Sequence, residues 1–172
     1  MKKILAIFAI TSSIFASNIG LQLTNKTLFI EGNVNIPQNP QFSIRGGYLI
    51  HKDKKNFEYA GVKVSGSTIG VNIPMIFSMG VDFVKTYKNS AIPLNIGLSS
   101  YIPYTQFPIF TRAEISYAPA ILSFQKADKF FKVKAEIGAT PIENAEIFIG
   151  YRNINFTKNY NSNLYIGAGF VF

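Results

Sequence analysis

The chain of 172 residues has no cysteine, no tryptophan and one histidine, and these absences exclude several classes of site. Without cysteine it can hold no disulfide framework, no thiolate-bound metal and no acylated cysteine anchor. We find no phosphate-binding loop, nucleotide fingerprint or metal-ligand spacing, so we predict no cofactor and no metal. The formal net charge is +8, but the basic residues do not gather in one stripe, so we predict no nucleic-acid partner.

Long apolar runs are also missing, and the one notable run lies near the start of the chain. Lys2 and Lys3 precede seven apolar residues, 4–10, and small residues follow up to Ala16. A helix needs about 20 apolar residues to span a membrane, so this run is too short, and its layout is typical of a secretory signal peptide. We predict a cleaved signal peptide over 1–16 and a single domain over 17–172. A buried amino-terminal helix is the alternative.

The rest of the chain is rich in segments where apolar and polar residues alternate. In one of them Phe131, Val133 and Ala135 alternate with Lys132 and Lys134. This period of two indicates strands with two unlike faces. A soluble sandwich would turn the apolar face inward, whereas a membrane barrel turns it outward. We favour the barrel because the polar face carries glycines that would leave room in a narrow lumen, namely Gly61, Gly80, Gly97, Gly138, Gly150, Gly167 and Gly169.

The alternating segments number about ten, and most have the roughly 9–11 residues that a tilted transmembrane strand needs. We therefore predict an all-β fold, an antiparallel transmembrane β-barrel of about ten strands, with eight as the alternative. The expected strands are 18–24, 27–36, 41–51, 56–66, 75–85, 91–102, 109–124, 130–141, 145–156 and 164–172.

The connections between these segments are of two kinds, which alternate along the chain. One set carries lysine, and the other carries proline, which cannot donate to a strand pairing and so ends a strand. Because successive hairpins point to opposite sides of a membrane, we place the lysine loops outside and the proline turns in the periplasm. The lysine set is 25–26, 52–56, 85–89, 125–129 and 157–163, and the proline set is 37–40, 74, 103–108 and 141.

The polar face of the predicted strands carries charges of both signs in nearly equal number. Unpaired charges inside a small barrel would be costly, so we expect them to form ion pairs that close the lumen. A narrow channel for ions or small polar solutes is the alternative. The predicted lumenal cluster is Glu31, Arg45, Lys63, Asp82, Arg112, Glu114, Lys132, Lys134, Glu136, Glu146 and Arg152.

Aromatic residues make up 15% of the chain and gather near segment ends. We interpret Tyr48, Tyr59, Tyr101, Phe107, Phe110, Tyr117, Tyr151 and Phe156 as girdles at the membrane interfaces. The last segment has an apolar row that runs from Leu164 to Phe172, as expected for the closing strand of a barrel. We predict that Tyr165, Gly167, Phe170 and Phe172 form the signature that the outer-membrane assembly machinery recognises.

The chain offers little to catalysis, and we predict that it is not an enzyme. Its only histidine, His51, opens a lysine-rich loop with no serine beside it, whereas a nucleophile needs a general base within reach. A lipid-modifying enzyme of the outer leaflet is the remaining alternative. The basic loops predict contact with outer-membrane lipids and lipopolysaccharide.

Three motifs resemble the YfaZ family of bacterial outer-membrane proteins. They are Tyr117–Phe124 with Ala127 and Asp128 after it, Ile149–Ile154, and, more weakly, Ala60–Val64. Ala120 stands where that family often has an acidic residue after the proline. The resemblance implies a location in the outer membrane of a Gram-negative bacterium and a porin-like barrel, without a defined biochemical role.

Overall fold

The computed structural model describes residues 17–68, 74–102 and 108–172, so the predicted signal peptide and Phe107 lie outside the described residues. The described chain is nearly all strand. The strands are β1 (Ser17–Leu23), β2 (Thr27–Ile36), β3 (Asn39–His51), β4 (Phe57–Ser67), β5 (Met75–Lys85), β6 (Asn89–Ala91), β7 (Leu94–Ile102), β8 (Ile109–Ala118), β9 (Ser123–Gln125), β10 (Phe130–Ile142), β11 (Ala145–Phe156) and β12 (Lys158–Val171). In these ranges no helix is long and apolar enough to cross a membrane.

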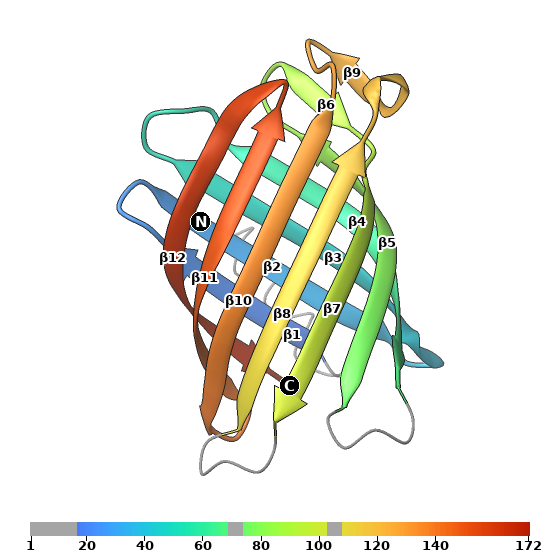
Figure 1. Cartoon of the computed structure of the whole chain (residues 1–172), viewed down its shortest axis with the longest axis vertical. Coiled ribbons are helices and arrows are strands. Elements are labelled where there is room, and N and C mark those ends of the chain that lie inside the picture. Colours follow the sequence, from blue (N-terminus) through green and yellow to red (C-terminus); the bar gives the residue numbers. More distant parts are fainter. Residues whose placement is uncertain (1–16, 69–73, 103–107) are drawn as a thin grey trace, which may run out of the picture.

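Ten of these strands close into an antiparallel barrel in which each strand pairs with its neighbours in sequence (Figure 1). β1 pairs with both β2 and β12, and β4 pairs with β5, so the ring has no open end. In Figure 1 the strands β8, β10 and β11 incline across β1, β2 and β3 behind them, as the strands of a tilted barrel do. The predicted ten-stranded barrel is therefore confirmed, and the eight-stranded alternative is wrong.

The short strands β6 and β9 stand outside the ring and correct two predicted segments. β6 pairs with the end of β5 and with β9. The predicted strand 91–102 begins only at Leu94, after Pro93. The predicted strand 109–124 ends at Ala118, because Pro119 has no N–H to continue the pairing and opens a one-turn 3₁₀ helix, η1 (Ala120–Leu122).

The last strand is longer than predicted, and the loop expected at 157–163 is mostly strand. Thr157 has φ 58°, and this left-handed conformation lets the chain reverse so tightly that Phe156 faces Lys158 across the β11–β12 hairpin. β12 therefore starts at Lys158 rather than at residue 164. The first part of β12, up to Tyr165, pairs only with β11, because the pairing with β1 ends at Leu23 and Ile166.

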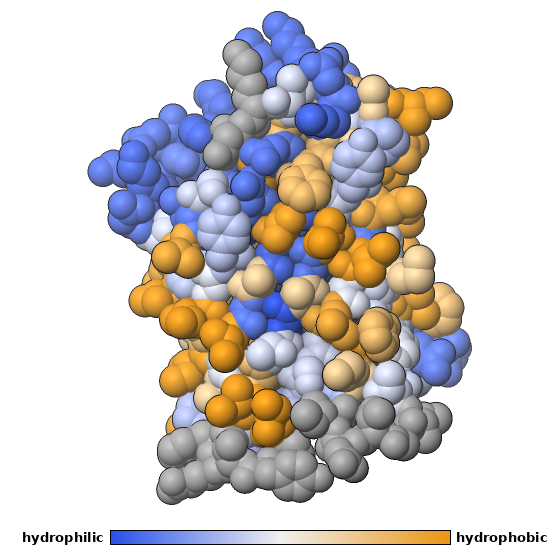
Figure 2. Space-filling model, in the orientation of Figure 1, coloured by the Kyte–Doolittle hydropathy of each residue, from blue (hydrophilic) through white to orange (hydrophobic). Residues whose placement is uncertain are grey.

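The apolar face of the sheet points outward all round the barrel, as predicted for strands of this period. Ile96, in the middle of its apolar row, is 62% exposed, and Leu164, at the start of the last row, is 78% exposed. Figure 2 shows many apolar side chains on the visible wall, with some hydrophilic residues between them at mid-height and others gathered at its upper end.

The turns that the structure describes lie alternately at the two ends, as predicted, with lysine at one end, the lysine end, and Pro37 in a turn at the other, the proline end. Two predicted proline turns are placed wrongly: Pro141 lies inside β10 and the chain turns at Glu143 and Asn144, and the turn predicted at 37–40 is shorter because β3 begins at Asn39.

The predicted girdle residues that the structure describes are divided between the two faces of the barrel, and only the outward ones are compatible with a girdle. Tyr48, Tyr101, Tyr117 and Tyr151 are exposed on the outer face. Tyr59, Phe110 and Phe156 are instead buried inside the barrel. Each of the three lies an even number of residues from an inward-facing charged residue on its own strand. Because side chains alternate between the faces with a period of two, each must also face inward, however close it lies to the strand end.

Candidate functional site

The centre of the barrel interior holds an arginine that joins three strands. Arg45 on β3 donates from Nε and Nη2 to the two carboxylate oxygens of Asp82 on β5, at 2.8 and 2.6 Å. Its Nη1 donates to Glu114 on β8 at 2.5 Å. Glu114 also pairs with Lys132 on β10 at 2.8 Å. Because Arg45, Asp82 and Lys132 are buried, each charge depends on its partners for the solvation it has lost.

A second group of paired charges lies on β2 and β10, beside this centre. Lys134 pairs with Glu31 at 2.5 Å and with Glu136 at 3.3 Å. The amide of Gln22 donates to the same two carboxylates, at 2.7 and 3.3 Å. Tyr59 connects the two groups, since its hydroxyl donates to Glu31 at 3.3 Å and Lys132 lies 4.9 Å above its ring.

Arg152 on β11 is fully buried and is held without an acidic partner among the described residues. Its guanidinium donates to Gln22 Oε1 and, at 3.4 Å, to Thr27 Oγ1. It also lies between two aromatic rings, 4.6 Å from the centroid of Phe29 and 5.2 Å from that of Tyr165. Cation–π contacts strengthen when the cation is desolvated, so the two rings provide part of the stabilisation of the buried charge that a carboxylate would otherwise provide.

Three interior glycines each lie on a strand between two hydrogen-bonded residues. One of these residues is on the strand before the glycine, and the other is on the strand after it. Gly61 lies between Arg45 and Asp82 in the sheet register. Gly47 lies in the same way between Glu31 and Tyr59. In each row the long side chains meet across the strand that carries the glycine.

The third row runs from Glu136 through Gly150 to Tyr165, whose hydroxyl donates to the Glu136 carboxylate at 2.9 Å. A Cβ on Gly150 would lie 2.6 Å from the Tyr165 ring. The predicted role of glycine in leaving room inside the barrel is thus confirmed at named contacts.

The two remaining predicted cations lie nearer the proline end. Arg112 pairs with Glu146 at 2.5 Å and stacks on Phe110, 4.1 Å from its ring centroid. Lys63 faces the interior without an acidic partner among the described residues. It lines a polar cavity of about 410 Å³ that Ser65, Ser78 and Ser99 also line. The structure therefore gives nine of the eleven predicted lumenal charges an ion-pair partner and leaves Lys63 and Arg152 without one.

The lysine end of the interior is filled by apolar and aromatic side chains, which we call the aromatic plug. Phe57 and Phe130 stack with centroids 6.3 Å apart, and Phe130 packs on Phe156 at 4.8 Å. All its members are buried, and together they cover the paired charges on that side. The aromatic plug comprises Phe29, Leu49, Phe57, Tyr59, Val84, Ala91, Ala118, Ala127, Phe130, Ile154 and Phe156.

Some of these functional residues were missed by the sequence analysis, although the alternation contains them. Gln22 falls between the outward Leu21 and Leu23, so its parity places it inside. Phe29 and Leu49 have the parity of interior residues but apolar side chains. The sequence signal for the aromatic plug is that strands become apolar on both faces near one end.

The predicted assembly signature divides between the two faces of β12. Phe170 and Phe172 are exposed and stack at 6.0 Å. Tyr165 and Gly167 face inward, where a Cβ on Gly167 would meet the ring of Phe148. Whatever their part in assembly, Tyr165 and Gly167 have a packing role inside the barrel.

His51 lies at the lysine end of β3 and is engaged with its own loop. Its Nδ1 accepts the backbone N–H of Asp53 at 3.0 Å, and its ring packs edge-on against Tyr160. Over residues 17–68, 74–102 and 108–172 no group of histidine, aspartate and glutamate side chains has the arrangement of a metal site. The charged groups described inside the barrel are joined by ion pairs and hydrogen bonds.

No family model matches this chain, and no curated protein matches it. The resemblance to YfaZ proteins therefore rests on three short motifs alone.

We predict that replacing Gly61 by alanine destabilises the barrel, because the added Cβ would lie 2.8 Å from Asp82 Cα and collide with its carboxylate. Overpacking of this kind costs about 1–3 kcal/mol of the free energy of unfolding. Gly66 on the same strand has open space at its Cβ position, so Gly66→Ala should be neutral or stabilising by up to about 1 kcal/mol. Urea unfolding of the two variants in lipid vesicles measures the difference, and equal midpoints would contradict it.

We also predict that the charges differ in their contribution according to their partners. Arg45→Met leaves Asp82 buried without its bidentate partner, and loss of one member of a buried pair costs about 3–5 kcal/mol. Lys63→Met removes a cation that no described carboxylate pairs with, so its free energy of unfolding should change far less. A loss in Lys63→Met as large as that in Arg45→Met, measured by the same unfolding experiment, would show that pairing does not decide the effect.

Proposed function

We propose that this protein is a small outer-membrane β-barrel whose interior is closed, and that it serves as a structural or interaction protein rather than as an enzyme. The single observation that carries the proposal is that apolar and charged side chains are distributed in the reverse of the way usual in soluble proteins. Apolar side chains cover the outside, while charged side chains are buried and paired inside.

The outer surface supports a bilayer as the surroundings of the barrel. Soluble monomers seldom expose apolar patches larger than a few hundred Å², yet here whole rows of isoleucine, leucine, valine and phenylalanine face outward on successive strands. In hydrocarbon every backbone N–H and C=O must find a partner within the protein, which a closed ring of strands provides. The aromatic rows that are exposed, among them Tyr48, Tyr117 and Tyr151, suit the interface.

Two layers support a closed lumen. The ion pairs around Arg45 and Lys134 cross the interior from strand to strand, and the aromatic plug fills the lysine end beyond them. The polar cavity at the proline end is thus a blind chamber in this arrangement. A narrow channel remains the second candidate because Lys63, the cation without an acidic partner among the described residues, faces that cavity.

We expect the purified barrel, reconstituted in a planar bilayer, to give no steady unitary conductance, because its side chains leave no water-filled path past the plug. Lys63→Met serves as the matched variant. Steady unitary steps from the wild type, with an ion selectivity that changes in Lys63→Met, would overturn the closed lumen and establish the channel.

We expect single introduced cysteines to report the orientation of the barrel, since the native chain has none to interfere. Lys88→Cys lies in an exposed lysine-bearing turn, and Ser78→Cys lines the cavity at the proline end. A thiol reagent too large to cross the outer membrane should label Lys88→Cys on intact cells. It should label Ser78→Cys only after the outer membrane has been permeabilised.

The reverse labelling pattern would contradict the assignment of the lysine loops to the outside. Labelling of neither position on intact cells, with labelling of both in a soluble fraction, would contradict the membrane location itself.

A further inference from the structure

A groove of about 820 Å³ runs along the outer wall where the β1–β2 hairpin diverges from β12. β1 pairs with β12 only as far as Leu23 and Ile166. Beyond that pair the hairpin turns away through Thr24 and Asn25, while β12 continues up to Lys158. The two elements therefore enclose a concave corner on the barrel wall.

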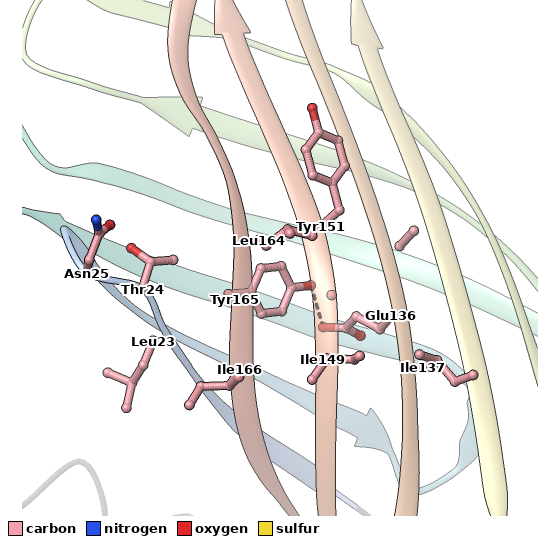
Figure 3. Close-up of a pocket in the computed structure, with 12 residues that line it drawn as sticks. Leu23, Thr24, Asn25, Glu136, Ile137, Ile149, Tyr151, Leu164, Tyr165 and Ile166 are labelled. Atoms are coloured by element: carbon pink, nitrogen blue, oxygen red, sulfur yellow. Dashed lines mark hydrogen bonds between the residues drawn. The ribbon is translucent and has the colours of Figure 1, made fainter.

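Figure 3 shows this corner, with Leu23, Thr24 and Asn25 on one side and Ile137 and Ile149 on the other. The floor is formed at Ala135, which faces outward on β10, and at Gly150 on β11. The hydrogen bond from Tyr165 to Glu136, dashed in Figure 3, closes the back of the groove toward the interior. The small outward side chain of Ala135 thus leaves space on the outer face.

The chemistry of the groove changes from one end to the other. Most of its length is lined by aliphatic side chains, namely Leu23, Ile137, Ile149, Leu164 and Ile166. Polar groups occur toward its upper end, where Thr24 and Asn25 form the hairpin turn and the hydroxyl of Tyr151 hydrogen-bonds to Ser162 at 2.9 Å. An occupant must therefore be apolar along its length and polar at one end.

Two lysines lie in turns near that polar end, outside the groove lining, and add positive charge. Lys26 follows Asn25 in the hairpin and keeps a half-exposed side chain beside Asp53, 3.1 Å away. Lys54, in the loop between β3 and β4, reaches the top of β12, where it donates to the carbonyl of Tyr160 and lies 5.6 Å over its ring. The occupant's polar end is thus expected to be anionic, and phosphate suits lysine as a point charge.

We propose that this groove binds an acyl chain of a phosphorylated glycolipid of the outer leaflet, lipid A, with a phosphate held at Lys26 and Lys54. The inference rests on the proposed membrane location and on the assignment of the lysine loops to the outer face, where lipid A resides. The volume falls within the roughly 300–1,000 Å³ of ligand pockets, and the aliphatic lining and flanking charge match a lipid of this class.

Native mass spectrometry of the intact barrel in detergent with added lipid A tests the proposal, with two tryptophan variants as the decisive pair. Ala135→Trp fills the floor of the groove. Ala113→Trp is its matched control, because Ala113 is exposed directly across from Ala135 on β8 and does not line the groove. We expect Ala135→Trp to weaken lipid A retention at least about tenfold, and Ala113→Trp to leave it unchanged.

The charged end is tested with Lys26→Gln combined with Lys54→Gln, against Lys88→Gln in another lysine-bearing turn. The first should weaken lipid A binding, and dephosphorylated lipid A should bind the wild type equally poorly. Equal retention by Ala135→Trp and Ala113→Trp would overturn the proposal. Groove-dependent binding of phosphatidylglycerol but not of lipid A would overturn the committed occupant. In each case the barrel must first show a heat-dependent shift in gel mobility and insertion into vesicles. Failure there would count against the proposed function instead.

Discussion

The constraint on which this structure depends is the pairing of β1 with β12, which closes the sheet into a ring. Once the ring is closed, every residue of a strand has only two places to go, inside or outside, and the two-residue period decides between them. A shift of one residue in this pairing would exchange the two faces of a strand. Closure therefore fixes the apolar exterior and the charged interior together, and neither can be changed without the other.

Closure also sets the problem that the interior must solve, because ten strands leave a lumen narrow enough for side chains to meet across it. Charges there have lost water and need partners, and the structure provides them over strands that are not neighbours. Arg45 reaches Asp82 over Gly61, Tyr59 reaches Glu31 over Gly47, and Tyr165 reaches Glu136 over Gly150. The glycines are thus part of the ionic network, since each one clears the path along which two partners meet.

How much could be read from the sequence follows from the same geometry. The number of strands, the alternating turns and the inward-facing charges could be predicted because they follow from a local pattern of two residues that the folded strands keep. The partners of the individual ion pairs, such as Lys134 and Glu31, depend on how strands far apart in the chain are placed in the barrel. No local sequence pattern encodes this placement. The aromatic residues were misplaced at Tyr59, Phe110 and Phe156 because proximity to a strand end was given more weight than parity.

The plug and the outer groove arise from departures from this regular pattern, and both lie toward the lysine end. Toward that end the strands become apolar on both faces, as at Phe29 and Leu49, so the interior changes from ionic to aromatic. At the same end β12 outlasts β1, which leaves Asn161 to Tyr165 paired on β11 alone. In the outer-membrane location proposed above, a strand edge of this kind inside hydrocarbon would carry unsatisfied backbone groups, so we propose that it lies at the level of the headgroups. The upper end of the groove would then lie where a charged headgroup and its acyl chain meet.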